Sequence, residues 1–337
     1  MGRHRRAPEN ADVALRGALL AVLDRELDEA ERLIAAAVKL DSTGVEPYLA
    51  LARLYRMRGE IGRAIRIHQN LLLRSDLTPA QTVAALADLA ADFQRGGFLQ
   101  RAIASWDEVL AHDPKHRRAL RALVPLLADV RDFPRAIEMS RRLARLGGDG
   151  GDVASETELL VQSAEHAHAE GRSDDARKAL KRALRRDARS VPAWIAFGEI
   201  EAERGRTKAA LAAWSRVPAL DRRAGARVYP RLEATYAALG RARDFEAYLA
   251  ERIAERPDDP QARLALARTL AARGAADEAL ESLRGLLERD PDDLEARATL
   301  GRILVSEGRD AEAAKAYGEL LDVLERRGPP RRLESLG

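Results

Sequence analysis

The chain has 337 residues, of which 46% are hydrophobic, 33% are charged and only 4% are aromatic, a composition that excludes a wholly disordered protein. Its 57 basic and 54 acidic residues leave a net charge of +3, which gives little reason to expect nucleic-acid binding. Cysteine is absent, so disulfides, thiolate metal sites and a cysteine nucleophile are excluded.

One pattern recurs along the chain: a glycine, four further residues, an alanine and then an apolar helix. Aligning the chain on that alanine position gives Ala30, Ala64, Ala102, Ala136, Ala176, Ala210, Phe245, Ala279 and Ala313. The successive spacings are 34, 38, 34, 40, 34, 35, 34 and 34. Because 34 residues is the period of the tetratricopeptide repeat, the sequence predicts an all-α superhelical solenoid of about nine helix-turn-helix repeats.

Each predicted unit has a first helix with a small residue where it approaches the second helix most closely. These residues are Ala52, Ala90, Ala164, Gly198, Ala267 and Gly301. A glycine then ends the first helix, since glycine adopts a left-handed backbone at little cost. The second helix carries a bulky residue on the facing side, as with Trp106, Trp214 and Tyr317. Repeats one, four and seven depart from the pattern, and repeat seven has Phe245 at the alanine position.

In chain order we expect a basic N-terminal tail (1–10), repeats one to four (11–146), a glycine-rich linker (147–154), repeats five to nine (155–326) and a C-terminal tail (327–337). The two longest spacings predict longer loops around Ser75–Ala80 and at Gly147–Gly151. Helix pairs of this kind are stabilised by stacking on their neighbours. The last predicted helix contains Leu320, Leu321, Val323 and Leu324, and we expect something to cover that face.

Several clusters suggest chemistry but fit a structural role better. His112 and His116 are separated by Pro114, and His166 and His168 diverge on a helix, so neither pair suits a metal. Gly147–Gly151 lacks the Lys-Ser/Thr of a phosphate-binding loop, and the acidic segments 258–260 and 290–293 are interpreted as helix caps. We therefore expect no metal, no cofactor and no catalytic site.

A basic segment on one predicted helix leaves two interpretations open. It contains Arg177, Lys178, Lys181, Arg182, Arg185, Arg186 and Arg189. A solvated helix face is the favoured interpretation, and a surface for an anionic partner or lipid headgroups is the alternative.

The first helices of such an array form a long concave surface, which is where we expect protein partners to bind. The inward-facing positions predicted from the repeat register are Glu46, Leu49, Arg53, Arg56, Gln94, Glu199, Arg268 and Arg302. Arginines in a groove suit acidic peptide segments or a carboxylate terminus.

Repeat two resembles the lipopolysaccharide assembly protein B (LapB) family. The residues that carry the resemblance follow Arg58 and are Gly59, Glu60, Arg63, Ala64, Ile65, Arg66, Ile67, His68 and Gln69. Leu77–Gln81 and Asp92–Phe98 continue it in order and spacing. For His68 and Gln69 we expect packing or solvent contact in preference to direct recognition.

This resemblance implies a non-enzymatic adaptor at the cytoplasmic face of the bacterial inner membrane. Such proteins regulate lipopolysaccharide synthesis by promoting degradation of the LpxC deacetylase by the FtsH protease. Family members usually begin with a membrane anchor and end in a rubredoxin-like metal domain, and we expect both parts to be trimmed or naturally absent here. The alternative is a generic repeat adaptor in another cell-envelope, pilus or secretion assembly, with the oligomeric state open in either case.

Overall fold

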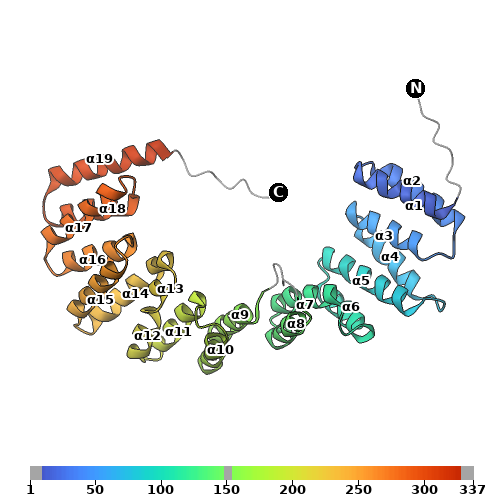
Figure 1. Cartoon of the computed structure of the whole chain (residues 1–337), viewed down its shortest axis with the longest axis horizontal. Coiled ribbons are helices and arrows are strands. Elements are labelled where there is room, and N and C mark those ends of the chain that lie inside the picture. Colours follow the sequence, from blue (N-terminus) through green and yellow to red (C-terminus); the bar gives the residue numbers. More distant parts are fainter. Residues whose placement is uncertain (1–9, 148–153, 328–337) are drawn as a thin grey trace. The chain divides into compact units, whose positions relative to one another are not determined.

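The computed structural model describes residues 10–147 and 154–327, and over these ranges the chain folds into nine successive helix pairs (Figure 1). No strand occurs in either range. The all-α tetratricopeptide-repeat prediction is therefore confirmed. The expected tails and most of the expected linker, residues 1–9, 328–337 and 148–153, lie outside the described residues.

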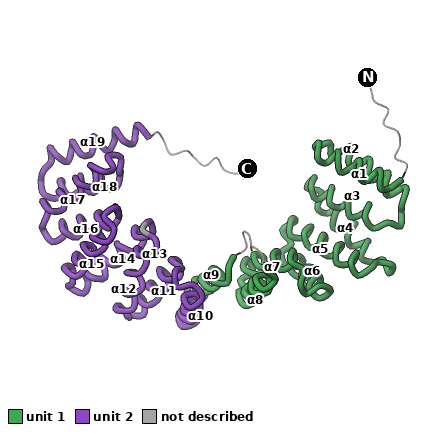
Figure 2. Tube along the Cα trace, in the orientation of Figure 1, with its two compact units in different colours: residues 1–166 green, residues 167–337 purple. Residues whose placement is uncertain are grey.

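Two compact units divide the chain between residues 166 and 167, inside α9 (Glu156–Ala169) (Figure 2). Unit 1 also contains α1 (Ala11–Leu23), α2 (Leu27–Leu40), α3 (Glu46–Met57), α4 (Ile61–Leu72), α5 (Pro79–Arg95), α6 (Leu99–His112), α7 (Arg117–Asp129) and α8 (Phe133–Arg145). Unit 2 contains α10 (Ser173–Arg186), α11 (Val191–Glu203), α12 (Thr207–Trp214), α13 (Val217–Leu220), the short 3-10 helix η1 (Arg222–Ala224), α14 (Gly225–Ala238), α15 (Ala242–Glu255), α16 (Pro260–Ala272), α17 (Ala276–Arg289), α18 (Leu294–Ser306) and α19 (Asp310–Arg327).

The aligned alanine position is buried in every repeat. All seven alanines from Ala30 to Ala279 at this position are 0% exposed, and Ala313 is 2% exposed. Phe245 fills the same position in repeat seven and is 1% exposed. Its ring stacks on Tyr236 and Tyr248, with centroid distances of 5.5 and 6.2 Å, so aromatic packing replaces close backbone approach.

The turn that ends each first helix keeps a left-handed backbone even where glycine is missing. Gly59, Gly97 and Gly205 have φ of 78°, 76° and 70°. In the irregular repeats one and four the same position is Arg25 (φ 61°) and Arg131 (φ 64°). A side chain in this conformation costs about 1–2 kcal/mol, so the packing of the two helices holds the turn against local preference.

The spacing between repeats two and three is 38 residues instead of 34, and the extra residues lie partly in a loop and partly in a helix. The second helix α4 ends at Leu72, and α5 begins at Pro79 after Thr78, whose side chain and that of Gln81 form a capping box. The first helix α5 has 17 residues, against 12 in α3.

Two further features complete the fold. At the C-terminal face, Val323 is buried, whereas Leu321 and Leu324 are 59% and 44% exposed. Within the described ranges, no helix combines the length and the hydropathy that crossing a bilayer requires.

Candidate partner-binding site

Two aspartates on the first helix of repeat three form the centre of the most polar buried cluster in unit 1. Asp88 and Asp92 are four residues apart on α5 and therefore lie on one face of the helix. Their exposed fractions are 1% and 0%. Carboxylates this deeply buried are stable only when cations or hydrogen-bond donors surround them.

Arginines from two other first helices supply those donors. Arg53 of α3 donates from Nε to Asp88 Oδ2 at 2.6 Å, and Arg56 donates to Asp92 Oδ1 at 2.6 Å and to Asp88 Oδ1 at 3.2 Å. Arg118 of α7 lies 3.4 Å from Asp88 Oδ1 and over the ring of Trp106. Asp88 thus connects α3, α5 and α7.

His68 is the remaining member of the cluster and contacts Asp92. It lies on α4 four residues after Ala64, where other repeats have Trp106, Leu180 or Trp214, and it is 0% exposed. Its Nδ1 is 2.6 Å from Asp92 Oδ2, while its Nε2 is buried without a hydrogen-bond partner. The imidazole therefore has a packing role and also holds the inner carboxylate in place.

The cluster leaves positive charge at the surface. Three guanidinium groups face two carboxylates, and the cations differ in exposure: the side chains of Arg53 and Arg118 are 51% and 52% exposed, whereas Arg56 is 18% exposed. We name Arg53, Arg56, Arg118, Asp88, Asp92 and His68 the unit 1 ionic cluster. Its two exposed arginines are held in position by a buried carboxylate, which pre-organises them for an anionic group.

The Asp88 carboxylate gives this cluster a defined acid dependence. Burial alone would raise its pKa, but the hydrogen bond from Arg53 and the charges of Arg53, Arg56 and His68 hold the pKa below the ordinary value of 3.8. A carboxyl group whose pKa is lower in the folded state stabilises the fold fully above its unfolded pKa. That stability is lost as the pH falls through the folded pKa.

We therefore expect the melting temperature to fall with acidification below about pH 4, and to fall less steeply in the Asp88→Asn variant. Thermal unfolding followed by circular dichroism across this range tests the expectation. If the melting temperature of the variant falls equally steeply below about pH 4, Asp88 does not contribute to the acid sensitivity of the fold.

The other partner-binding residues predicted in unit 1 divide into core and surface. Leu49 is 8% exposed and packs with Val45, Leu71 and Ala85. Its side chain therefore belongs to the core and is not part of the predicted partner-binding surface. Glu46 and Gln94 are exposed.

In unit 2 the predicted residues form separate local pairs. Glu199 accepts a hydrogen bond from Arg231 at 2.6 Å. Arg268 lies between Glu233 and Glu295, at 3.8 and 3.4 Å, and Arg302 donates to Thr299 at 3.2 Å. The structure does not unite these residues into one cluster comparable to that of unit 1.

The repeat-two motif mainly builds the repeat itself. Gly59 forms the turn, Ala64 and His68 are buried, and Glu60 accepts from Arg63 at 2.6 Å. The Arg63 guanidinium lies 3.8 Å from the centre of the Tyr55 ring. Ile65 and Ile67 are half-buried, while Arg66 and Gln69 are exposed.

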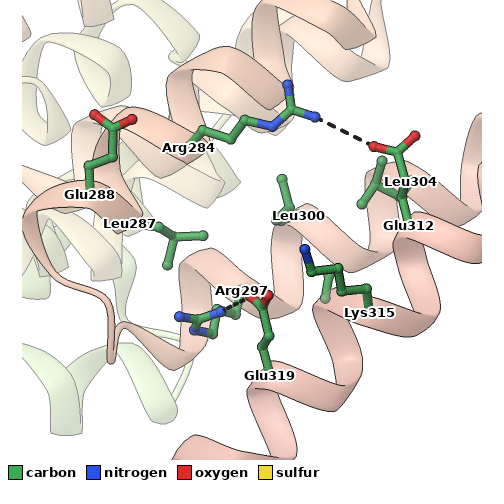
Figure 3. Close-up of a pocket in the computed structure, with 10 residues that line it drawn as sticks. Arg284, Leu287, Glu288, Arg297, Leu300, Leu304, Glu312, Lys315 and Glu319 are labelled. Carbon is green, nitrogen blue, oxygen red and sulfur yellow. Dashed lines mark hydrogen bonds and ion pairs between the residues drawn. The ribbon is translucent and has the colours of Figure 1, made fainter.

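A hollow of about 480 Å³ in unit 2 is a second candidate, lined by α17, α18 and α19 (Figure 3). Leu287, Leu300 and Leu304 contribute apolar surface to it. The charged lining residues are three basic and three acidic, and they include two ion pairs, Arg284 with Glu312 at 3.6 Å and Arg297 with Glu319. Because these charges balance, the hollow lacks the excess of cations that the unit 1 ionic cluster offers.

Three of the four histidines discounted as metal ligands have structural contacts. His116 caps α7 by accepting from the Ala119 backbone at 3.1 Å, and His166 packs against Phe133. His168 lies 3.1 Å from Glu203. Across residues 10–147 and 154–327, no group of three or more potential ligands is arranged for a metal.

Comparisons with known proteins agree with this fold. Tetratricopeptide-repeat family profiles match residues 167–234 and 241–321. Lipopolysaccharide assembly protein B of Escherichia coli K12 is 29% identical over 249 residues, which are 73% of this chain and 63% of that protein. The protein of the same name from Haemophilus influenzae is 33% identical over 101 residues, 30% of this chain and 26% of that protein.

The helices of this chain form a tetratricopeptide-repeat region, and its sequence is similar to that of lipopolysaccharide assembly protein B. The match with the Escherichia coli relative spans less than two thirds of that protein. Among solved structures, MamA aligns with 49% of this chain and 95% of its own, at 21% identity and a TM-score of 0.36.

Sequence reasoning missed three members of the unit 1 ionic cluster, Asp88, Asp92 and Arg118. A signal was present, because two acidic residues four apart interrupt the apolar face of a first helix. Asp88 also lies 35 residues after Arg53, about one repeat further along the chain. Opposite charges one repeat apart on first helices are therefore a pattern to search for in such arrays.

Proposed function

We propose that this protein is a non-enzymatic adaptor in lipopolysaccharide assembly that brings the LpxC deacetylase to the FtsH protease. The sequence similarity to lipopolysaccharide assembly protein B of Escherichia coli supports a role in lipopolysaccharide assembly. The observation that carries the capture mechanism is the excess of guanidinium groups in the unit 1 ionic cluster, two of them half-exposed.

Capture by this surface requires an anionic segment on the partner. A guanidinium group recognises a carboxylate through directed, charge-assisted hydrogen bonds, so Arg53 and Arg118 suit an acidic peptide or a chain terminus. Exposed cations also raise the rate of encounter, and this gain decreases with salt. An adaptor of this kind acts by raising the local concentration of substrate beside the protease and needs no catalytic group of its own.

We place this activity at the cytoplasmic face of the inner membrane, where the protease and its substrate would meet. Depleting the protein from the bacterium that makes it is expected to lengthen the half-life of the deacetylase. Affinity purification from the same cells is expected to recover the protease or the deacetylase. If neither the half-life nor co-purification depends on the protein, the proposed function fails, and an adaptor in another cell-envelope assembly becomes the explanation of the fold.

A further inference from the structure

After the first turn of α10, the second helix of repeat five, every exposed residue of this helix is a cation. We name Lys178, Lys181, Arg182, Arg185 and Arg186 the α10 basic face, and all five are exposed. Ala176, Leu180 and Ala183 of the same helix are fully buried. With 3.6 residues per turn, the five cations fall within an arc of about 140°, opposite the buried residues.

Local structure explains only part of this charge. Arg185 and Arg186 lie in the last turn, where cations interact favourably with the helix dipole. Lys178 pairs with Asp175 at 3.2 Å. Among the described residues, no ion pair or side-chain hydrogen bond involves Lys181, Arg182 or Arg185. Lys181 and Arg182, which have neither an ion pair nor a place in the last turn, therefore need another reason to lie on this face.

The repeat itself does not require a basic residue at these positions. Aligning Ala176 with Ala279 places the same five positions of α17 at Glu281, Arg284, Gly285, Glu288 and Arg289. Those residues carry no net charge, whereas the α10 basic face carries five positive charges. The next second helix, α12, adds exposed Lys208 and has no acidic residue. α10 and α17 thus occupy equivalent places in their repeats, but only α10 carries a net positive charge at these five positions.

We propose that the α10 basic face binds the headgroups of an anionic phospholipid surface. No large apolar side chain is exposed within it, so it lacks the buried anchor that protein interfaces usually need. It also lacks aromatic rings on which the bases of a single strand could stack, and it lies flat on the outside of a packed helix instead of projecting into a nucleic-acid groove. Clustered lysines and arginines on a helix match a plane of anionic headgroups. This inference does not rest on the proposed adaptor role.

The test compares two double variants of the full chain. Each cation removed near an anionic surface lowers partitioning by about fivefold, so Lys181→Gln/Arg185→Gln is expected to weaken vesicle binding about 25-fold. Glutamine preserves helix propensity. The matched control is Arg284→Gln/Arg289→Gln on α17, which removes the same charge and is expected to leave vesicle binding within about twofold of the unchanged protein.

Binding is measured by co-flotation with vesicles of phosphatidylcholine alone and of phosphatidylcholine mixed with phosphatidylglycerol, at low and high salt. The proposal predicts binding to the mixed vesicles only, weakened by salt and about 25-fold weaker in the α10 variant. Equal weakening by both variants would indicate a general charge effect and overturn it. Absence of binding to mixed vesicles would overturn it as well. Tighter binding to double-stranded RNA, lost in the same variant, would assign the face to nucleic acid instead.

Discussion

Replacing Asp92 with alanine is expected to destabilise the protein by about 3–5 kcal/mol, because the change leaves a buried void and deprives Arg56 of one of its two carboxylate partners and His68 of its hydrogen-bond partner. Asp92 is 0% exposed and accepts from both residues at 2.6 Å. Removal of one member of a buried ionic pair is costly even where the pair itself contributes little net stability. Chemical denaturation followed by circular dichroism measures the loss.

Asp107→Ala provides the matched control for this change. Asp107 also pairs with an arginine, Arg135, at 2.7 Å, but the two side chains are 41% and 44% exposed. Exposed pairs contribute little because water already solvates both charges. If Asp92→Ala costs no more than Asp107→Ala, the unit 1 ionic cluster is not a structural centre of repeats two and three.

Gly198→Ala is expected to destabilise the protein by about 1–3 kcal/mol through overpacking. An added Cβ would lie 2.3 Å from Trp214 Nε1 and 2.5 Å from Cδ1 of the same ring. Trp214 is 4% exposed, and its Nε1 donates to the Ile195 carbonyl oxygen at 3.3 Å, so the indole cannot move aside freely. The first helix α11 must therefore shift away from α12.

Gly285→Ala is the control of opposite sign. Gly285 also lies within a helix, but nothing lies within 4 Å of an added Cβ. Alanine is favoured over glycine in a helix by about 0.8–1 kcal/mol, so this change is expected to stabilise the protein. The melting temperatures of both variants test this expectation. If both substitutions shift the melting temperature in the same direction, the packing described at Gly198 is contradicted.

The helix pairs could be predicted because their packing rule is local and repeats. A small residue must face a bulky one, as Gly198 faces Trp214, and the 34-residue period marks each recurrence. The left-handed turns at Arg25 and Arg131 could not be inferred from those residues alone, since arginine seldom adopts that conformation. Only the register set by neighbouring repeats requires it.

The candidate site was partly predictable for a related reason. The repeat register placed Arg53 and Arg56 on the same surface but treated them as equivalent. Their different roles depend on Asp88 and Asp92, which lie 32 to 36 residues further along the chain and approach them only after folding. Arg56 consequently stabilises the fold, while Arg53 remains available at the surface.

The affinity of the purified protein for the deacetylase, compared with that of the Arg53→Gln/Arg118→Gln variant, tests the central claim most directly. Arg56 stays in place in this variant to hold Asp88, so helicity is expected to be unchanged. Loss of about 1.4 kcal/mol or more of binding free energy would weaken the affinity at least tenfold. The account predicts this loss, with the Arg284→Gln/Arg289→Gln control unaffected. Unchanged affinity of the Arg53→Gln/Arg118→Gln variant, with helicity intact, would contradict it.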